Sequence, residues 1–174
     1  MADVIELDEV DAVIAGARGE PGQREFLIQA RHGAANLTVL VEKEQVAILA
    51  REAKRLLQRL EADFPTETPN ESGTGPMAIS EPADPLFRAR SIGLGFDPAR
   101  GRLVIELREQ PGDDEDEPES DDDADGWIAR IYATRAQVSA MANAGSAAVV
   151  AGRPTCDLCG FPMDPSGHIC PRLN

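Results

Sequence analysis

The sequence predicts an α+β fold, in which a mostly antiparallel sheet is made by two strand-rich repeats that each end in a helix, followed by a short C-terminal zinc knuckle. Alternating apolar residues predict strands in several segments, and two longer segments change to the 3.6-residue period of amphipathic helices. All three cysteines lie close to the C-terminus. Hydrophobic residues make up 42% of the chain but aromatic residues only 4%, so Val, Ile, Leu and Ala must fill the core.

The first repeat, residues 1–64, begins with strands. Loose alternation over 3–16 predicts one or two short strands. The segment 20–23 predicts a β-turn, because its proline suits the second turn position and its glycine suits the third. Alternating apolar residues over 24–41, interrupted by a His-Gly pair, then predict a β-hairpin.

A helix is expected from about Lys43, because the apolar period changes there to the spacing of one helix face. Pro65 follows the expected end of this helix. The apolar residues of the stripe are Val46, Leu49, Ala53, Leu56, Leu57, Leu60 and Phe64.

Residues 65–85 contain Pro, Thr, Glu, Ser and Gly with little to bury, and we expect a flexible linker there. The second repeat, residues 86–152, starts with a predicted hairpin. Its strands cover 87–96 and 103–107, and turn-forming residues lie between them. An acidic loop at 111–126 follows.

The second repeat ends with a predicted strand and helix. Trp127–Ala133 alternates as a strand does. Thr134 and Gln137 form a capping box, in which the hydroxyl and the amide bond the free N–H groups at a helix start. We expect the helix to run from Arg135 to about residue 151, where a glycine and a proline stop it.

The two halves of the chain are similar to each other. Lys43–Ala50 matches Arg135–Ala142 at an offset of 92 residues, and the alternation of 37–41 matches that of 129–133 at the same offset. We therefore expect one domain over 1–152 made of two repeats. Chance similarity between two hairpin-plus-helix units explains the match equally well.

The chain is acidic, with a formal net charge of −14. Ten acidic residues lie within 113–125, which indicates a disordered solubilising loop or, alternatively, a segment that recruits a basic partner. An acidic chain repels phosphate backbones, so nucleic-acid binding is not expected. No apolar run approaches the roughly 20 residues that span a bilayer, and the N-terminus lacks the features of a secretory signal. The sequence therefore predicts a cytoplasmic protein without membrane contact, and it leaves the oligomeric state open.

The tail, residues 153–174, contains the strongest motif of the chain. Three thiolates and one imidazole form a common structural zinc set, and four protein ligands leave no open position for a substrate. So short a tail cannot bury a core of its own, so the metal is expected to supply most of its folding free energy. The expected ligands, with the spacing C-x2-C-x8-H-x-C, are Cys156, Cys159, His168 and Cys170. A redox C-x-x-C, unligated cysteines and another thiophilic metal are the alternatives.

Four stretches of the sequence resemble one known family. They are Ala151–Gly160, Asp164–Asn174, Arg18–Arg24 and Glu42–Val46. Together they are similar to an uncharacterised actinobacterial family, the domain of unknown function 3090, over nearly the whole chain. The resemblance implies this length and this terminal Cys/His cluster, but it implies no activity. The chain departs from the family pattern in its acidic insertion at 113–125, which implies that the insertion is dispensable.

Six polar residues around the first hairpin form a second candidate site. One interpretation is a pocket for a small anionic or phosphorylated ligand, with arginine as a bidentate partner. The alternative interpretation is that they pair locally in turns or remain solvated. The six residues are Arg18, Glu20, Gln23, Arg24, Arg31 and His32.

The closed metal set favours one class of protein, a non-catalytic module that docks a protein partner. It makes an enzyme the less favoured class. No phosphate-binding glycine loop, nucleophile elbow or spaced carboxylate pair occurs in its required context, so no catalytic residue is assigned. The alternative is an enzyme, or an accessory subunit of one, that acts on an anionic ligand near the first hairpin. Nucleic-acid regulation through the tail ranks third, because Arg153 and Arg172 are the only local bases.

Overall fold

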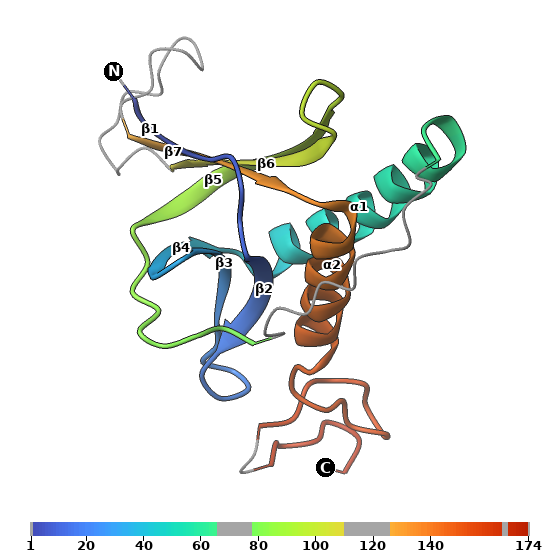
Figure 1. The fold of residues 1–174 in the computed structure, drawn as a ribbon. Helices are drawn as coiled ribbons and strands as arrows, with labels where there is room; N and C mark the ends of the chain where they lie inside the picture. The colour runs from blue at the N-terminus through green and yellow to red at the C-terminus, as the bar shows by residue number, and fades with distance from the viewer. Residues whose placement is uncertain (1, 66–77, 110–125, 165–166, 174) are drawn as a thin grey trace, which may run out of the picture.

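The computed structural model describes residues 2–65, 78–109, 126–164 and 167–173 (Figure 1). In these residues seven strands and two helices are present. In chain order they are β1 (Asp3–Leu7), β2 (Ala12–Arg18), β3 (Glu25–His32), β4 (Ala35–Val41), α1 (Lys43–Asp63), β5 (Phe87–Asp97), β6 (Arg102–Glu109), β7 (Trp127–Ala133) and α2 (Arg135–Val150).

All seven strands form one sheet with the order β1-β7-β6-β5-β4-β3-β2. The expectation of a mostly antiparallel sheet is corrected here, because the sheet is mixed. β1 pairs with β7 in parallel, and β4 joins β5 in parallel through the pairs Val39↔Phe87 and Leu40↔Arg88. Alternation along a strand shows which face each side chain takes, but it does not show the direction of the neighbouring strand.

The two helices pack against each other beside the sheet and close the main core (Figure 1). α2 also contacts β2 and β6, while α1 contacts β5. The crossing of the helices is close at Gly145, where an added Cβ would lie 3.1 Å from Val46 Cγ1 and 3.2 Å from Ala15 Cβ. The largest fully buried apolar side chains are Leu27, Ile28, Leu103, Ile105, Leu107, Ile131, Met141, Val39, Val46 and Val138.

Residues 78–86 lie against the strands of the first half. Gln29, which is fully buried in β3, accepts a 2.9 Å hydrogen bond from the Ser80 N–H and donates a 3.0 Å bond to the Ser80 carbonyl. Ala83 is also buried, and the Leu86 N–H bonds the Thr38 carbonyl at 2.8 Å. This part of the expected linker is therefore tied to the sheet by polar contacts, while residues 66–77 lie outside the described residues.

Most of the elements expected from the sequence are confirmed, including the hairpin over 24–41, both helices and the Thr134 capping box. The turn at 20–23 closes through a 2.9 Å bond from the Gln23 N–H to the Glu20 carbonyl. β4 and β7, like α1 and α2, begin 92 residues apart, although the origin of the halves as repeats stays a prediction. The acidic loop lies outside the described residues apart from its last position, Gly126. Neither helix combines the length and hydropathy needed to cross a membrane.

Candidate metal centre

The tail leaves the end of α2 and folds into a small hairpin beyond the sheet (Figure 1). Thr155 and Pro162 form an antiparallel bridge, and the Cys156 N–H bonds the Phe161 carbonyl at 2.8 Å. Between these residues the chain turns back, with a 2.8 Å bond from the Gly160 N–H to the Cys156 carbonyl. The first two cysteines therefore lie on one tight turn.

Glycine is required at two turns of the tail. Gly160 has a φ of +73° and Gly167 has a φ of +93°, a region that residues with a Cβ rarely adopt. Gly160 follows Cys159 directly, and Gly167 precedes His168. Gly160 thus lets the backbone reverse after the pair Cys156 and Cys159, and Gly167 lets it reverse before the pair His168 and Cys170.

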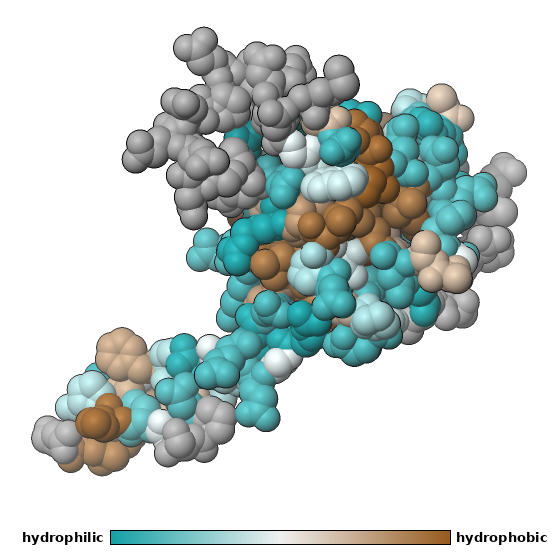
Figure 2. Space-filling model, turned by 90° about the vertical axis from the view of Figure 1, so that its left-hand side faces the viewer, coloured by the Kyte–Doolittle hydropathy of each residue, from teal (hydrophilic) through white to brown (hydrophobic). Residues whose placement is uncertain are grey.

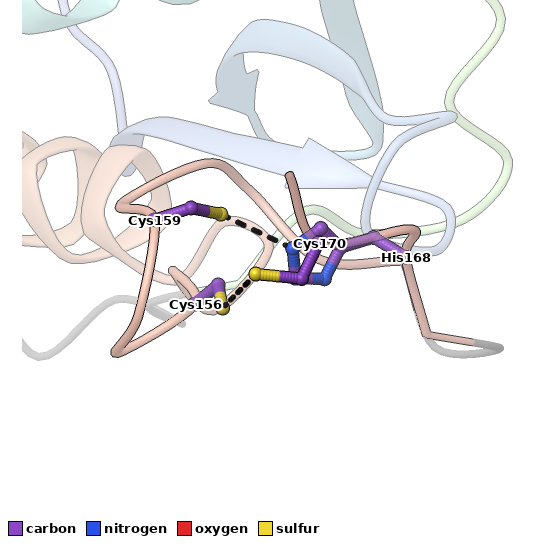
Figure 3. Close-up of side chains that lie close together, drawn as sticks. All are labelled: Cys156, Cys159, His168 and Cys170. Carbon is purple, nitrogen blue, oxygen red and sulfur yellow. Dashed lines mark hydrogen bonds between the residues drawn. The ribbon is translucent and has the colours of Figure 1, made fainter. Parts of the chain in front are cut away.

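The four side chains expected to bind a metal converge (Figure 3). Cys159 Sγ lies 3.2 Å from His168 Nε2, and Cys156 Sγ lies 4.0 Å from Cys170 Sγ. All four ligand atoms lie within 4.8 Å of one another. In a tetrahedral zinc site with Zn–S bonds of about 2.3 Å, neighbouring sulfurs are about 3.8 Å apart. The cluster therefore has the size of a single four-coordinate metal site.

The thiols are free, and their surroundings support ligation. The 4.0 Å separation of Cys156 and Cys170 is about twice a disulfide bond length. Both of these cysteines are buried, while Cys159 and His168 are half-buried. A redox C-x-x-C usually opens a helix, whereas Cys156 and Cys159 lie in the turn of a hairpin.

Backbone dipoles point at the first cysteine. The N–H groups of Cys159 and then Leu158 lower the pKa of the Cys156 thiol. The Phe161 N–H lowers the pKa of Cys159, but burial and the hydrogen bonds with Cys156 and Cys170 outweigh it, so that pKa is raised. The backbone N–H groups therefore favour a thiolate at Cys156, and a bound cation would stabilise thiolates at the cluster.

Arg24 holds the junction between α2 and the tail, and an ion pair of Arg153 holds the tail internally. Arg24 donates to the carbonyls of Ala148, at 3.0 Å, and of Ala151, which lie at the C-terminal end of α2. Arg153 pairs with Asp164 at 2.8 Å inside the tail. Because backbone carbonyls at a helix end carry partial negative charge, the Arg24 guanidinium both caps α2 and fixes the start of the tail.

The six polar residues expected around the first hairpin do not all come together: four lie at the turn between β2 and β3, and two lie at the other end of β3. Arg18 and Arg24 flank the turn between β2 and β3, whereas Arg31 and His32 are at the opposite end of β3. Arg18 pairs with Glu25 at 2.6 Å, and His32 Nδ1 lies 2.6 Å from the Glu9 carbonyl oxygen. The exposed residues Glu20 and Gln23 belong to the same turn as Arg24.

Sequence reasoning missed a group of cations near Arg24. Lys43, Arg88 and Arg153 line a cavity together with Arg24. These residues are far apart in the sequence, so no local motif marks them. The one available signal was a lysine at the first position of a helix, where acidic residues are favoured.

The fold and the site define a class of protein: a mixed α+β domain with a C-terminal Cys/His cluster that can hold a metal ion. The chain belongs to the family described as Protein of unknown function (DUF3090), whose family model matches residues 5–170. No curated protein and no solved structure matches the chain.

Proposed function

We propose that the tail binds one zinc ion in a structural site and that the protein acts as a non-catalytic interaction module for a protein partner. The observation that carries this proposal is the convergence of three thiols and one imidazole within 4.8 Å. A thiolate-rich set with one imidazole suits zinc, and four protein ligands complete its tetrahedral shell. A closed shell leaves no position for a substrate or an activated water, which favours a structural role.

The metal would supply the folding free energy that the tail lacks. In the described part of the tail only Cys156 and Cys170 are buried. Two buried thiols bury too little apolar surface to offset the ordering of some twenty residues, each of which costs on the order of 1–2 kcal/mol. A structural zinc ion contributes on the order of 10 kcal/mol or more, which is enough to order a segment of this size. A reducing compartment such as the cytoplasm would keep the thiols available for it.

The surface of the tail supports a docking role. Figure 2 shows the tail extending away from the rest of the molecule, with hydrophobic residues gathered near its end. Large apolar side chains on so small a unit are unusual unless a partner covers them. The exposed fractions are 50% for Leu158, 58% for Phe161, 84% for Ile169 and 73% for Leu173.

Metal content tests the first part of the proposal. Elemental mass spectrometry of protein purified without added metal should find about one zinc per chain, with thiols that react only after chelation. Cys159→Ser should lose the metal, whereas Asp157→Asn, an exposed change between the first two ligands, should keep it. Metal-free protein with rapidly reacting Cys156 and Cys159 would contradict the zinc site and favour redox chemistry.

Partner capture tests the second part. Ile169 and Leu173 carry the two most exposed apolar side chains among the four, so Ile169→Ser with Leu173→Ser should abolish capture of a specific protein while zinc content stays at one per chain. The matched control is Ile48→Ser, a half-exposed apolar residue of α1. Equal capture by all three proteins would contradict docking through the tail.

A further inference from the structure

A cavity of about 360 Å³ lies where the turn between β2 and β3, the start of α1 and the beginning of the tail meet. The charged residues that line it are Arg24, Lys43, Arg88, Arg153, Glu25 and Glu42. Four cations against two acids make a positive site on a chain whose formal net charge is −14. The cavity is separate from the Cys/His cluster.

Both acids of the cavity, and two of its arginines, already have ionic partners. Arg88 pairs with Glu42 at 2.6 Å, and Arg153 pairs with Asp164 at 2.8 Å. Glu25 pairs with Arg18, also at 2.6 Å. These pairs cancel one another's charge and leave two cations, Arg24 and Lys43.

Neither remaining cation forms an ion pair with a carboxylate among the described residues. Arg24 is held in place by the backbone carbonyls of Ala148 in α2 and of Ala151 directly after it, which orient the guanidinium without neutralising its full charge. Lys43 Nζ lies next to the tail, 3.4 Å from the position that a Cβ on Gly152 would take. The two cations therefore face the same cavity from the turn before β3 and from the start of α1.

The dipole of α1 disfavours a cation at the position of Lys43. Lys43 is the first residue of α1, where the helix dipole is positive. Arg135 has the equivalent position in α2, but it lies 3.6 Å from the Glu61 carboxylate and donates to the Leu60 carbonyl at 3.3 Å. Only the lysine lacks such a partner in the described structure, and an anion in the cavity would provide one.

We propose that this cavity binds a small phosphate monoester. A phosphate group carries a charge of about −1.5 to −2 at pH 7, which matches the two cations. The volume is near the lower end of the range of about 300–1,000 Å³ found for ligand pockets, so it suits a small molecule. Phe26, Leu40 and Val41 line the same cavity and offer apolar contacts for the organic part of an ester.

Calorimetric titration with ribose 5-phosphate, inorganic phosphate and ribose tests this site on the full-length protein. We expect ribose 5-phosphate to bind more tightly than inorganic phosphate, and ribose not to bind. Lys43→Gln should weaken binding of ribose 5-phosphate about tenfold or more, because a charge-assisted hydrogen bond is lost. Lys54→Gln removes the same charge from an exposed position of α1 and should leave the affinity unchanged.

Each other outcome overturns part or all of the assignment. Equal weakening by both lysine variants would reduce the effect to general electrostatics and overturn the site. Inorganic phosphate that binds as tightly as ribose 5-phosphate would overturn the ester and leave a simple anion site. No heat and no rise of melting temperature with millimolar ribose 5-phosphate, for a protein that is folded by circular dichroism, would overturn the proposal.

Discussion

The body, from β1 to α2, and the tail differ in how much apolar surface they bury. The body buries apolar side chains in one contiguous core. They come from both helices and from every strand except β1. The tail buries two cysteines and exposes most of its large apolar side chains. Stability in the body is therefore distributed over many residues, whereas in the tail it would depend on the metal ion proposed to join the four Cys/His side chains. A substitution should be severe in the body when it removes volume, and severe in the tail when it removes a ligand.

The strongest test of this contrast is a cavity-forming change in the body. Ile105 is fully buried in β6, between Leu94 of β5 and Ile131 of β7. Ile105→Ala should lower the free energy of unfolding by about 2–5 kcal/mol, since the surrounding side chains refill such a void only in part. Urea denaturation followed by the fluorescence of Trp127, the single tryptophan, measures this loss.

The control is Val104→Ala on the opposite face of the same strand. Val104 is half-buried, so the loss should be clearly smaller, on the order of 1 kcal/mol. Equal losses at the two positions would show that the helix-covered face does not carry the main core. In Ile105→Ala the zinc content of the still-folded protein should stay at the wild-type level, because the ligands belong to the tail.

The features that can be predicted from the sequence are those set by a local residue pattern or by residues close together in the chain. The apolar stripe from Val46 to Leu60 marks α1, and Thr134 with Gln137 marks the start of α2. The four candidate metal ligands fall within fifteen positions, so two tight turns are enough to bring them together. For that reason the closeness of these four side chains can be predicted without knowledge of the fold.

The rest depended on contacts between distant segments. β1 pairs with β7, more than one hundred residues later, and alternation contains no information about that partner or its direction. The Gln29 side chain bonds the main chain of Ser80, and such bonds require no pattern of apolar residues in 78–86. The sequence of this segment therefore does not indicate the contact. The six polar residues at the first hairpin are close in sequence. The two ends of the eight-residue strand β3 are nevertheless about 23 Å apart, so residues at opposite ends cannot share one pocket.

A smaller effect is expected where the two regions meet. Arg24 bonds the last carbonyls of α2, so Arg24→Ala should lower the stability of the body by about 1 kcal/mol, the typical value of a cation at a helix C-terminus. It should also loosen the start of the tail. Hydrogen exchange read at the amides of residues 147–153 would show faster exchange there and little change in the central strands.

The matched control for that change is Arg51→Ala. Arg51 is exposed on α1 and pairs only with its neighbour Glu52 among the described residues, so its loss should be nearly neutral. If Arg51→Ala and Arg24→Ala gave the same exchange at the end of α2, the capping role of Arg24 would be wrong. A tail that exchanged equally in wild type and Arg24→Ala would show that Arg24 does not position the start of the tail.

The smallest effect on stability is expected for ion pairs, and we compare one ion-pair network in the body with one ion pair in the tail. Burial raises the pKa of the Glu106 carboxyl, but hydrogen bonds from Arg130 and Arg108 outweigh it, and the pKa is lowered in the folded protein. Because this pKa is lowered, the ionised Glu106 stabilises the folded protein fully above the ordinary carboxyl pKa of about 4.5. This stabilisation is lost as pH falls through the lower pKa of the folded state.

Glu106→Gln should therefore destabilise the body by less than about 1 kcal/mol at pH 7, and the difference from wild type should shrink steadily below about pH 4.5. Asp164→Asn removes the carboxylate that pairs with Arg153 in the tail, where the two side chains are 53% and 37% exposed. Unfolding of the body, measured by urea titration from pH 3 to 7, should not respond to it. A pH-dependent change of equal size in both variants would mean that the tail contributes to the stability of the body, and the separation of the two regions would then fail.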